Sequence, residues 1–218
     1  MTDSKKVQRD LYRAAIDLIE IGKSELAEET YKLALDLNPN DFRSITNLAV
    51  IIDKSGRVNE AEKLYLKTAH PPFYDAFAMF NLGYLYSRQD KMDLAEEWYR
   101  RAITAHPRYF EAYVNLAGLK QQQGNDPEAE ALLVKALEIE PRDVIANFEL
   151  ANIFRKRKEF FQAEMLYRRA VDLDNTNPHA LYNLASFLVE IDHSEEAQRY
   201  FDLAYEYDTE GKLKPGKH

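Results

Sequence analysis

The sequence predicts an all-α protein made of six copies of one helical hairpin. An alanine recurs every 34 residues, followed four residues later by a large apolar residue and three residues after that by a small one. Residues at spacings of four and three share one face of a helix, so this signature marks one helix of each copy. A period of this length is typical of stacked helix pairs. The alanines are Ala27, Ala61, Ala95, Ala129, Ala163 and Ala197.

A second signature, upstream of each alanine, predicts the other helix of the hairpin. A leucine followed by a small residue marks five copies, and Ala14 with Ala15 is a weaker first copy. A further residue on the same face follows three positions after the small one, and it is apolar in every copy except at Lys120. Such spacing predicts an amphipathic helix that comes first in each hairpin, called the inner helix below, and its small residue lets the second, or outer, helix approach closely. The leucines are Leu48, Leu82, Leu116, Leu150 and Leu184.

Turn residues predict where these helices end. A residue in the left-handed conformation ends a helix, without a steric cost when it is glycine. The residues at the turn within each copy are Gly22, Gly56, Asp90, Gly124, Lys158 and Asp192. Between the second and third copies, His70, Pro71 and Pro72 arrive early. Because proline cannot continue a helix, we expect the second outer helix to stop near Thr68.

With these residues identified, the chain resembles the tetratricopeptide repeat family. The resemblance implies a right-handed α-solenoid superhelix of six helix-turn-helix repeats, in which the inner helices line a concave groove. The repeats are expected at residues 8–41, 42–75, 76–109, 110–143, 144–177 and 178–211. Residues 1–7 would form an N-terminal lead-in and residues 212–218 a C-terminal tail.

Composition narrows the class of partner. The net charge of -8 argues against general binding to nucleic acid or anionic membranes, since both require clustered lysine and arginine. No apolar run approaches the roughly 18 residues of a membrane span, and the polar stretch from Met1 to Asp10 lacks the core of a signal peptide. The chain has no cysteine, which removes disulfides and thiolate metal sites. We therefore expect a cytoplasmic protein.

The sequence offers no catalytic constellation. None of the five histidines has another histidine at metal-ligand spacing, and no glycine-rich phosphate loop is present. His70, His106 and His179 fall in or beside the joints between repeats, where solvated polar residues are the simpler explanation. We predict that the protein is not an enzyme and that it uses no metal or other cofactor.

A row of asparagines on the inner helices is the main functional candidate. Asn47, Asn81, Asn115 and Asn183 occupy equivalent positions that the resemblance places in the groove, and Glu149 interrupts the row. The asparagine side chain both donates and accepts hydrogen bonds, so it can pair with an extended peptide backbone. The row is similar to the asparagine ladder in the repeat domain of O-linked N-acetylglucosamine transferase. The alternative is that each asparagine only bonds its own backbone or a neighbour.

Apolar anchors beside this row would supply the rest of a binding site. Gly118 lacks a side chain one turn after Asn115, which would let a ligand approach, although glycine inside a helix costs about 1 kcal/mol relative to alanine. The same positions can also serve the core, where aromatic residues commonly pack. The remaining candidates on the groove side are Phe77, Phe80, Tyr84, Arg88 and Phe148.

The last outer helix carries an excess of aromatic residues. We predict that Tyr200, Leu203 and Tyr207 form an adhesive C-terminal face, which either binds a second copy or is covered by the tail from Gly211. Apolar patches of this kind are seldom left open on monomers.

These observations predict a non-catalytic protein-protein interaction scaffold that binds an extended peptide segment in its groove. Two alternatives stay open. The chain is either a self-assembling structural scaffold, or a substrate-recruiting or regulatory segment of a larger enzyme or complex. The identity of the partner, the biological process and the oligomeric state are not encoded in any motif.

Overall fold

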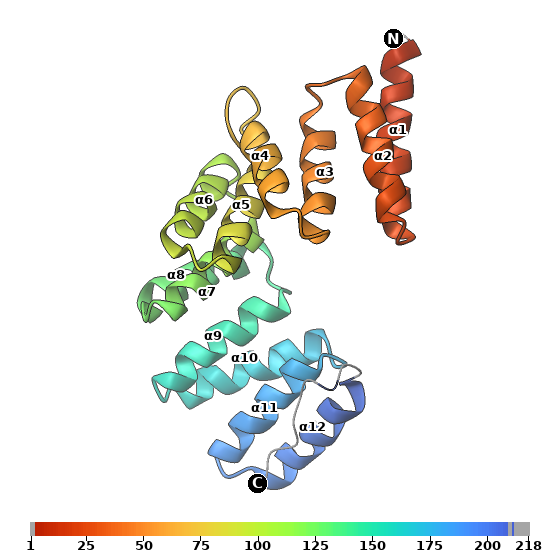
Figure 1. Ribbon diagram of the computed structural model, residues 1–218. Coiled ribbons are helices and arrows are strands. Elements are labelled where there is room, and N and C mark those ends of the chain that lie inside the picture. Colours follow the sequence, from red (N-terminus) through yellow and green to blue (C-terminus); the bar gives the residue numbers. More distant parts are fainter. Residues whose placement is uncertain (1–2, 209–210, 212–218) are drawn as a thin grey trace. The chain divides into compact units, whose positions relative to one another are not determined.

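The computed structural model describes residues 3–208 and 211, and within these ranges all regular secondary structure is helical (Figure 1). This confirms the all-α class. Helices come in consecutive pairs joined by short turns. Their bounds are α1 (Asp3–Glu20), α2 (Ser24–Leu37), α3 (Phe42–Lys54), α4 (Val58–Ala69), α5 (Ala76–Arg88), α6 (Met92–Ala105), α7 (Phe110–Gln122), α8 (Asp126–Ile139), α9 (Val144–Lys156), α10 (Phe160–Leu173), α11 (Pro178–Glu190) and α12 (Ser194–Tyr207).

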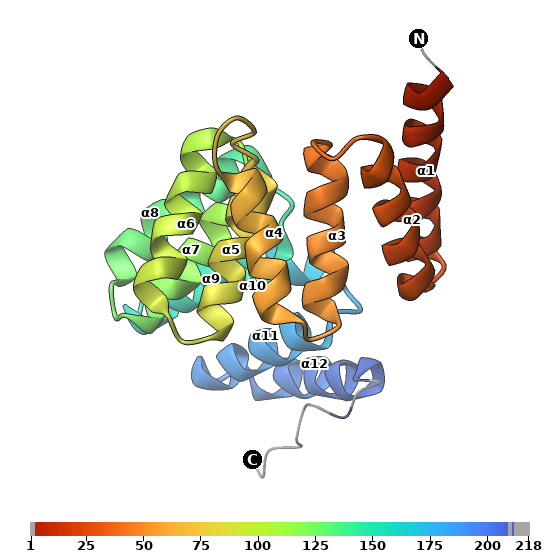
Figure 2. The ribbon, with the colours of Figure 1, turned by 45° about the horizontal axis from the view of Figure 1, so that its top comes forward.

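The chain divides into two compact units, Met1–Ala112 and Tyr113–His218. In the first unit, α1 packs on α2, α3 on α4 and α5 on α6, and each of α2 and α4 also packs on the inner helix that follows it (Figure 2). The buried tyrosines Tyr31, Tyr65 and Tyr99 sit in this core beside alanines of the repeated signature. Small residues at these positions allow the close approach of the two helices.

The second unit repeats the same packing. Within it, α9 packs on α10 and α11 on α12, while α8 and α10 each contact the inner helix that follows. Its core includes Tyr167, Phe187 and Phe201, with Tyr167 and Phe187 rings 5.2 Å apart between centroids. In both units the sequence period places the large residue of the outer helix in the core, as predicted.

All six predicted turn residues adopt the left-handed conformation. Their φ angles are 75° at Gly22, 83° at Gly56, 61° at Asp90, 75° at Gly124, 61° at Lys158 and 63° at Asp192. In each turn the next residue donates its backbone N–H to a carbonyl five positions earlier, as Lys23 does to Leu18 at 2.8 Å. This bond satisfies a carbonyl that the helix end would otherwise leave unpaired.

Asparagine or aspartate starts several inner helices, a feature that the sequence analysis did not identify. Asp41 accepts a hydrogen bond from the backbone N–H of Ser44, and Asp143 does the same from Ala146. These side chains satisfy N–H groups that have no partner within the helix. The second outer helix, α4, ends at Ala69, one residue after the predicted stop.

The structure adds detail at the N-terminus and at Lys120. Helix α1 begins at Asp3, inside the expected lead-in of residues 1–7, because that stretch contains good helix formers such as Lys5 and Lys6. Lys120 does not break the buried stripe. Its side chain is only 7% exposed, and Nζ lies 3.1 Å from the Gln123 Oε1 and 3.5 Å from the Glu128 carboxylate, which compensate its charge. No described helix combines the length and the apolar character that crossing a membrane requires.

Candidate functional site

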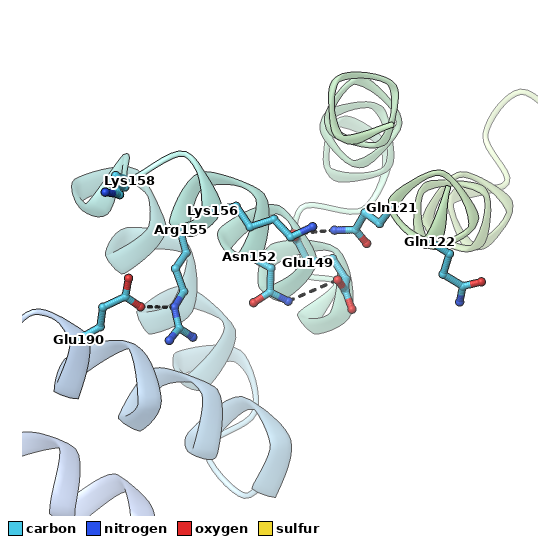
Figure 3. Close-up of a pocket in the computed structure, with 9 residues that line it drawn as sticks. Gln121, Gln122, Glu149, Asn152, Arg155, Lys156, Lys158 and Glu190 are labelled. Carbon is cyan, nitrogen blue, oxygen red and sulfur yellow. Dashed lines mark hydrogen bonds and ion pairs between the residues drawn. The ribbon is translucent and has the colours of Figure 1, made fainter. Parts of the chain in front are cut away.

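The inner helices of the second unit surround an open hollow of about 710 Å³ (Figure 3). Helix α7 contributes residues to one side, α9 forms the middle, and α11 contributes one residue to the other side. The lining residues are Gly118, Gln121, Gln122, Glu149, Asn152, Arg155, Lys156, Lys158 and Glu190. Of the binding residues that the sequence predicted, Gly118 is the one that lines this hollow.

Side-chain amides form the middle of this hollow. Asn152 donates its amide to the Glu149 carboxylate at 3.4 Å (Figure 3). It also accepts a 2.6 Å hydrogen bond from the buried Tyr167 hydroxyl. Burial raises the pKa of Tyr167, so this hydroxyl stays a donor at neutral pH. Gln121 donates to the Glu149 backbone carbonyl at 3.5 Å. An amide held in this way keeps further donor and acceptor capacity for a polar ligand.

Charges at the hollow are mixed. Arg155 pairs with Glu190, and the Lys156 Nζ lies 3.2 Å from Asp126. Lys158, in the left-handed turn after α9, has no ion-pair partner among residues 3–208. Within the same stretch, histidine, aspartate and glutamate residues form no cluster that could hold a metal ion.

Gly118 is open on the side where a side chain would point. A Cβ atom placed there would meet no heavy atom within 4 Å. Gly83 lies on the inner helix of the preceding repeat, one position before Tyr84, which is the equivalent of Gly118, and its surroundings are different. A Cβ on Gly83 would lie 2.6 Å from the Tyr99 ring, so that glycine is required by packing. No contact of this kind explains Gly118.

Three asparagines of the row form hydrogen bonds within the protein itself. Asn81 donates its amide to the Phe77 carbonyl one turn earlier at 2.7 Å, and Asn183 does the same to His179. Asn47 donates to the Tyr12 hydroxyl at 3.2 Å, and Asn115 is half-buried. The alternative considered above, bonding to the own backbone or a neighbour, therefore accounts for one N–H of the Asn47, Asn81 and Asn183 side chains. Their role toward a ligand stays a prediction.

The aromatic candidates of the first unit separate into two groups. Phe80 packs on Tyr99 and Tyr109, with ring centroids 5.8 and 5.1 Å away, so it belongs to the core side of α5. Phe77 and Tyr84 are exposed on the same helix. Arg88 lies over the Tyr84 ring at 5.2 Å and pairs with Asp53. Phe77, Tyr84 and Arg88 are thus accessible to a ligand.

Sequence reasoning missed one apolar residue and two amides of the second unit. Ile145, at the start of α9, is 58% exposed, whereas the expected anchor Phe148 is half-buried with its ring 6.1 Å from Tyr167. Ile145 follows Phe77 by two full repeats, and that equivalence is the signal that could have found it. Gln121 and Asn152 carry no such signal, because their neighbours in the other repeats are not amides.

The C-terminal candidates lie on α12. Leu203 and Tyr207 are exposed, while Tyr200 is half-buried and packs against the core of the second unit. Phe201 and Ala204 are buried. Most of the tail expected to cover this face, residues 212–218, lies outside the described residues.

The chain matches known proteins in sequence. Sequence patterns of the tetratricopeptide repeat match residues 11–41, 86–148 and 166–199. The human protein O-mannosyl-transferase TMTC3 is 33% identical over 96 residues, which is 42% of this chain and 10% of that protein. The chain thus matches about a tenth of the length of this relative.

Solved structures share the fold over most of the chain. PilF of Pseudomonas aeruginosa superposes with a TM-score of 0.83 at 18% identity, covering 94% of both chains. A tetratricopeptide repeat protein from Parabacteroides merdae gives 0.70 at 20% identity, covering 93% of this chain and 80% of that one. A thermophilic repeat protein from Thermus thermophilus gives 0.65 at 21% identity, covering 84% and 99%.

Paired helices, the 34-residue period and the inner-helix hollow define a helical-repeat protein of the class that generally serves as a protein-interaction scaffold. The chain belongs to the tetratricopeptide repeat family, with six repeats.

Proposed function

We propose that this protein is a non-catalytic scaffold that binds an extended peptide segment on its inner-helix face. The observation that carries the proposal is the hollow of the second unit, where side-chain amides surround the bare Gly118. A helix interior tolerates glycine at a cost of about 1 kcal/mol, and no packing contact requires it here. Close approach of a ligand backbone offers a reason for the missing side chain.

Amides alone do not hold a ligand. A net hydrogen bond contributes about 0.5–1.5 kcal/mol, whereas association costs an estimated 4–15 kcal/mol. Apolar contacts are needed in addition. Ile145 in the second unit, and Phe77 with Tyr84 in the first, are exposed on inner helices and would provide them. Within each unit the site therefore combines amides with at least one apolar anchor.

The test uses the full chain and a labelled peptide selected against it from a random 12-residue library. Gly118→Leu fills the hollow, so we expect it to weaken binding of that peptide tenfold or more. Ala131→Leu, which places the same side chain on an exposed site of the outer helix α8, is the matched control and should leave affinity unchanged. Circular dichroism confirms that both variants stay helical. If the selected peptide bound the Gly118→Leu variant as tightly as the wild type, the hollow would not be the peptide-binding site.

A second candidate is a recruiting segment of a larger enzyme. Its support is the 33% identity to a stretch of a human protein named as an O-mannosyl-transferase, of which this chain matches a tenth. Under this proposal the same hollow would present substrate segments to a catalytic domain. Joining the chain to such a domain would then lower the KM for substrates that carry the selected peptide, and Gly118→Leu would abolish that effect.

The third candidate is self-assembly through Leu203 and Tyr207, whose exposure on α12 favours it. Sedimentation at rising protein concentration separates this candidate from the first two.

A further inference from the structure

The fifth outer helix departs from the other five at its most exposed positions. Phe161 is 74% exposed and Met165 is 59% exposed, although both are large and apolar. They stand one helical turn apart on α10 and therefore on one face. The equivalent pairs in the other repeats are Glu25 and Glu29, Asn59 and Lys63, Asp93 and Glu97, Pro127 and Ala131, and Glu195 and Arg199. Only the fifth repeat places two large apolar side chains there.

Two contacts show that α8 lies beside Phe161 and Met165. Arg157, just before α10, forms an ion pair of 2.9 Å with Glu130 on α8, and Arg169 donates to the carbonyl of Pro141, just after α8, at 2.9 Å. The part of α10 between these contacts must therefore run along α8. One helical turn beyond Arg157 and Glu130 come Phe161 and Val134, and Val134 is also exposed. We call Val134, Phe161 and Met165 the α10 patch.

Uncompensated positive charge bounds this patch along α10. Arg168 is paired with Glu164 and Glu196, whereas Arg169 donates a hydrogen bond to a neutral carbonyl. Lys158, before the patch, has no carboxylate partner within residues 3–208. A partner seated on the patch would meet apolar surface in the middle and a cation at each end. Exposed apolar surface with a polar rim is typical of protein interaction sites.

We propose that the α10 patch docks an amphipathic helix from another protein, with an apolar centre and acidic residues on both sides. Lys158 precedes α10 by two residues, and the helix rises about 14 Å from Phe160 to Arg169 at roughly 1.5 Å per residue. The partner helix would carry its acidic residues about three turns apart. A helix suits this surface because its backbone groups are already paired, whereas α10 offers no free backbone groups to an extended chain.

Charge disfavours a parallel pair with a second copy of this chain, because Lys158 and Arg169 would each face their own copy and like charges at an interface oppose association. In an antiparallel pair centred on the patch, Phe161 would meet Met165, and the residues opposite Lys158 and Arg169 would be Arg168 and Arg157, which already have carboxylate partners. Self-association is therefore an outcome that the test must separate. Lys158 also lines the inner-helix hollow, but Val134, Phe161 and Met165 do not, so docking on these three residues does not rest on the proposed peptide binding there.

The probes are three labelled 18-residue alanine-based helices. The first has glutamates near both ends and a leucine and phenylalanine stripe at the centre, the second replaces the glutamates by lysines, and the third replaces the apolar stripe by glutamines. Binding to the full chain is followed by fluorescence anisotropy and by the methyl signal of Met165 in NMR. We expect the first helix to bind at least tenfold more tightly than the other two, with the Met165 signal shifted.

The variant Phe161→Asn with Met165→Lys installs the pair that the second repeat carries at these positions, Asn59 and Lys63. It should lose at least tenfold in affinity for the first helix and keep its helical signal. Leu33→Lys, at a 54% exposed leucine on α2, is the control and should not change affinity. Equal binding of the acidic and basic helices overturns the proposal. So does a loss caused equally by the control, or concentration-dependent self-association that the double variant abolishes.

Discussion

Replacing Gly118 by alanine should stabilise the protein, whereas the same change at Gly83 should not. Both glycines lie inside inner helices, where alanine is favoured by about 1 kcal/mol. At Gly118 the added methyl group meets nothing within 4 Å, so the full gain is expected. At Gly83 it would lie 2.6 and 2.7 Å from two atoms of the Tyr99 ring and 3.0 Å from a third.

The ring of Tyr99 has little room to yield. Its side chain is 1% exposed, and Phe80 packs on it with centroids 5.8 Å apart. Forcing an extra methyl group into a packed core costs about 1–3 kcal/mol, which exceeds or cancels the helix gain. We therefore expect Gly83→Ala to range from neutral to a loss of about 2 kcal/mol, and Gly118→Ala to gain about 0.5–1 kcal/mol.

Urea unfolding followed by circular dichroism, at equal protein concentration, measures both changes against the wild type. The fourth repeat supplies the control, since it pairs Ala117 with Leu133 at the positions of Gly83 and Tyr99. Combining Gly83→Ala with Tyr99→Leu should cost less than the sum of the two single changes, because the methyl group then has no ring to displace. If Gly83→Ala stabilised the protein as much as Gly118→Ala, the packing argument for Gly83 would be refuted.

Three further predictions concern an ion pair, a turn residue and the C-terminal face. Arg168 lowers the pKa of Glu196, so this ion pair stabilises the fold above the pKa of the unfolded carboxyl group and loses its effect as pH falls through the folded pKa. Arg168→Gln should therefore lower the free energy of unfolding by about 0.5–1 kcal/mol at pH 7 and by almost nothing at pH 2, and an equal loss at both pH values would contradict the pairing. Lys158→Gly should raise stability by about 0.5–1 kcal/mol in thermal melts, since φ is 61° there, and a lower melting temperature would count against it. Tyr200→Glu with Leu203→Glu should abolish any self-association seen in sedimentation, and persistent association would place the contact elsewhere.

The repeated signatures predicted the helices and turns because these depend on local backbone chemistry. Lys158 adopts the left-handed conformation that glycine adopts at this position in three other repeats. The repeat requires a helix to end at this position, and this requirement outweighs the steric cost of the lysine side chain. Helix α1 begins at Asp3, ahead of the first repeat at residue 8, where no repeated signature marks a helix start.

The candidate site was predicted in part. Gly118 and the exposed Phe77 and Tyr84 lie where the repeat places them, and Phe80 instead packs into the core. Phe77 and Phe80 differ by three positions on one helix, so periodicity alone places both near the same face. What separates them is the presence of Tyr99 and Tyr109 beside Phe80, and those residues come from other parts of the chain.

The sequence by itself determined the class, the number of hairpins and the residues that end them, since each of these is set by contacts within a few residues along the chain. Tertiary structure decided which side chains are covered. The hollow exists because α7, α9 and α11 present Gly118, Asn152 and Glu190 to a common space. The burial of Lys120 and the exposure of Phe161 also follow from how the helices pack around each side chain, which the repeat period alone does not specify.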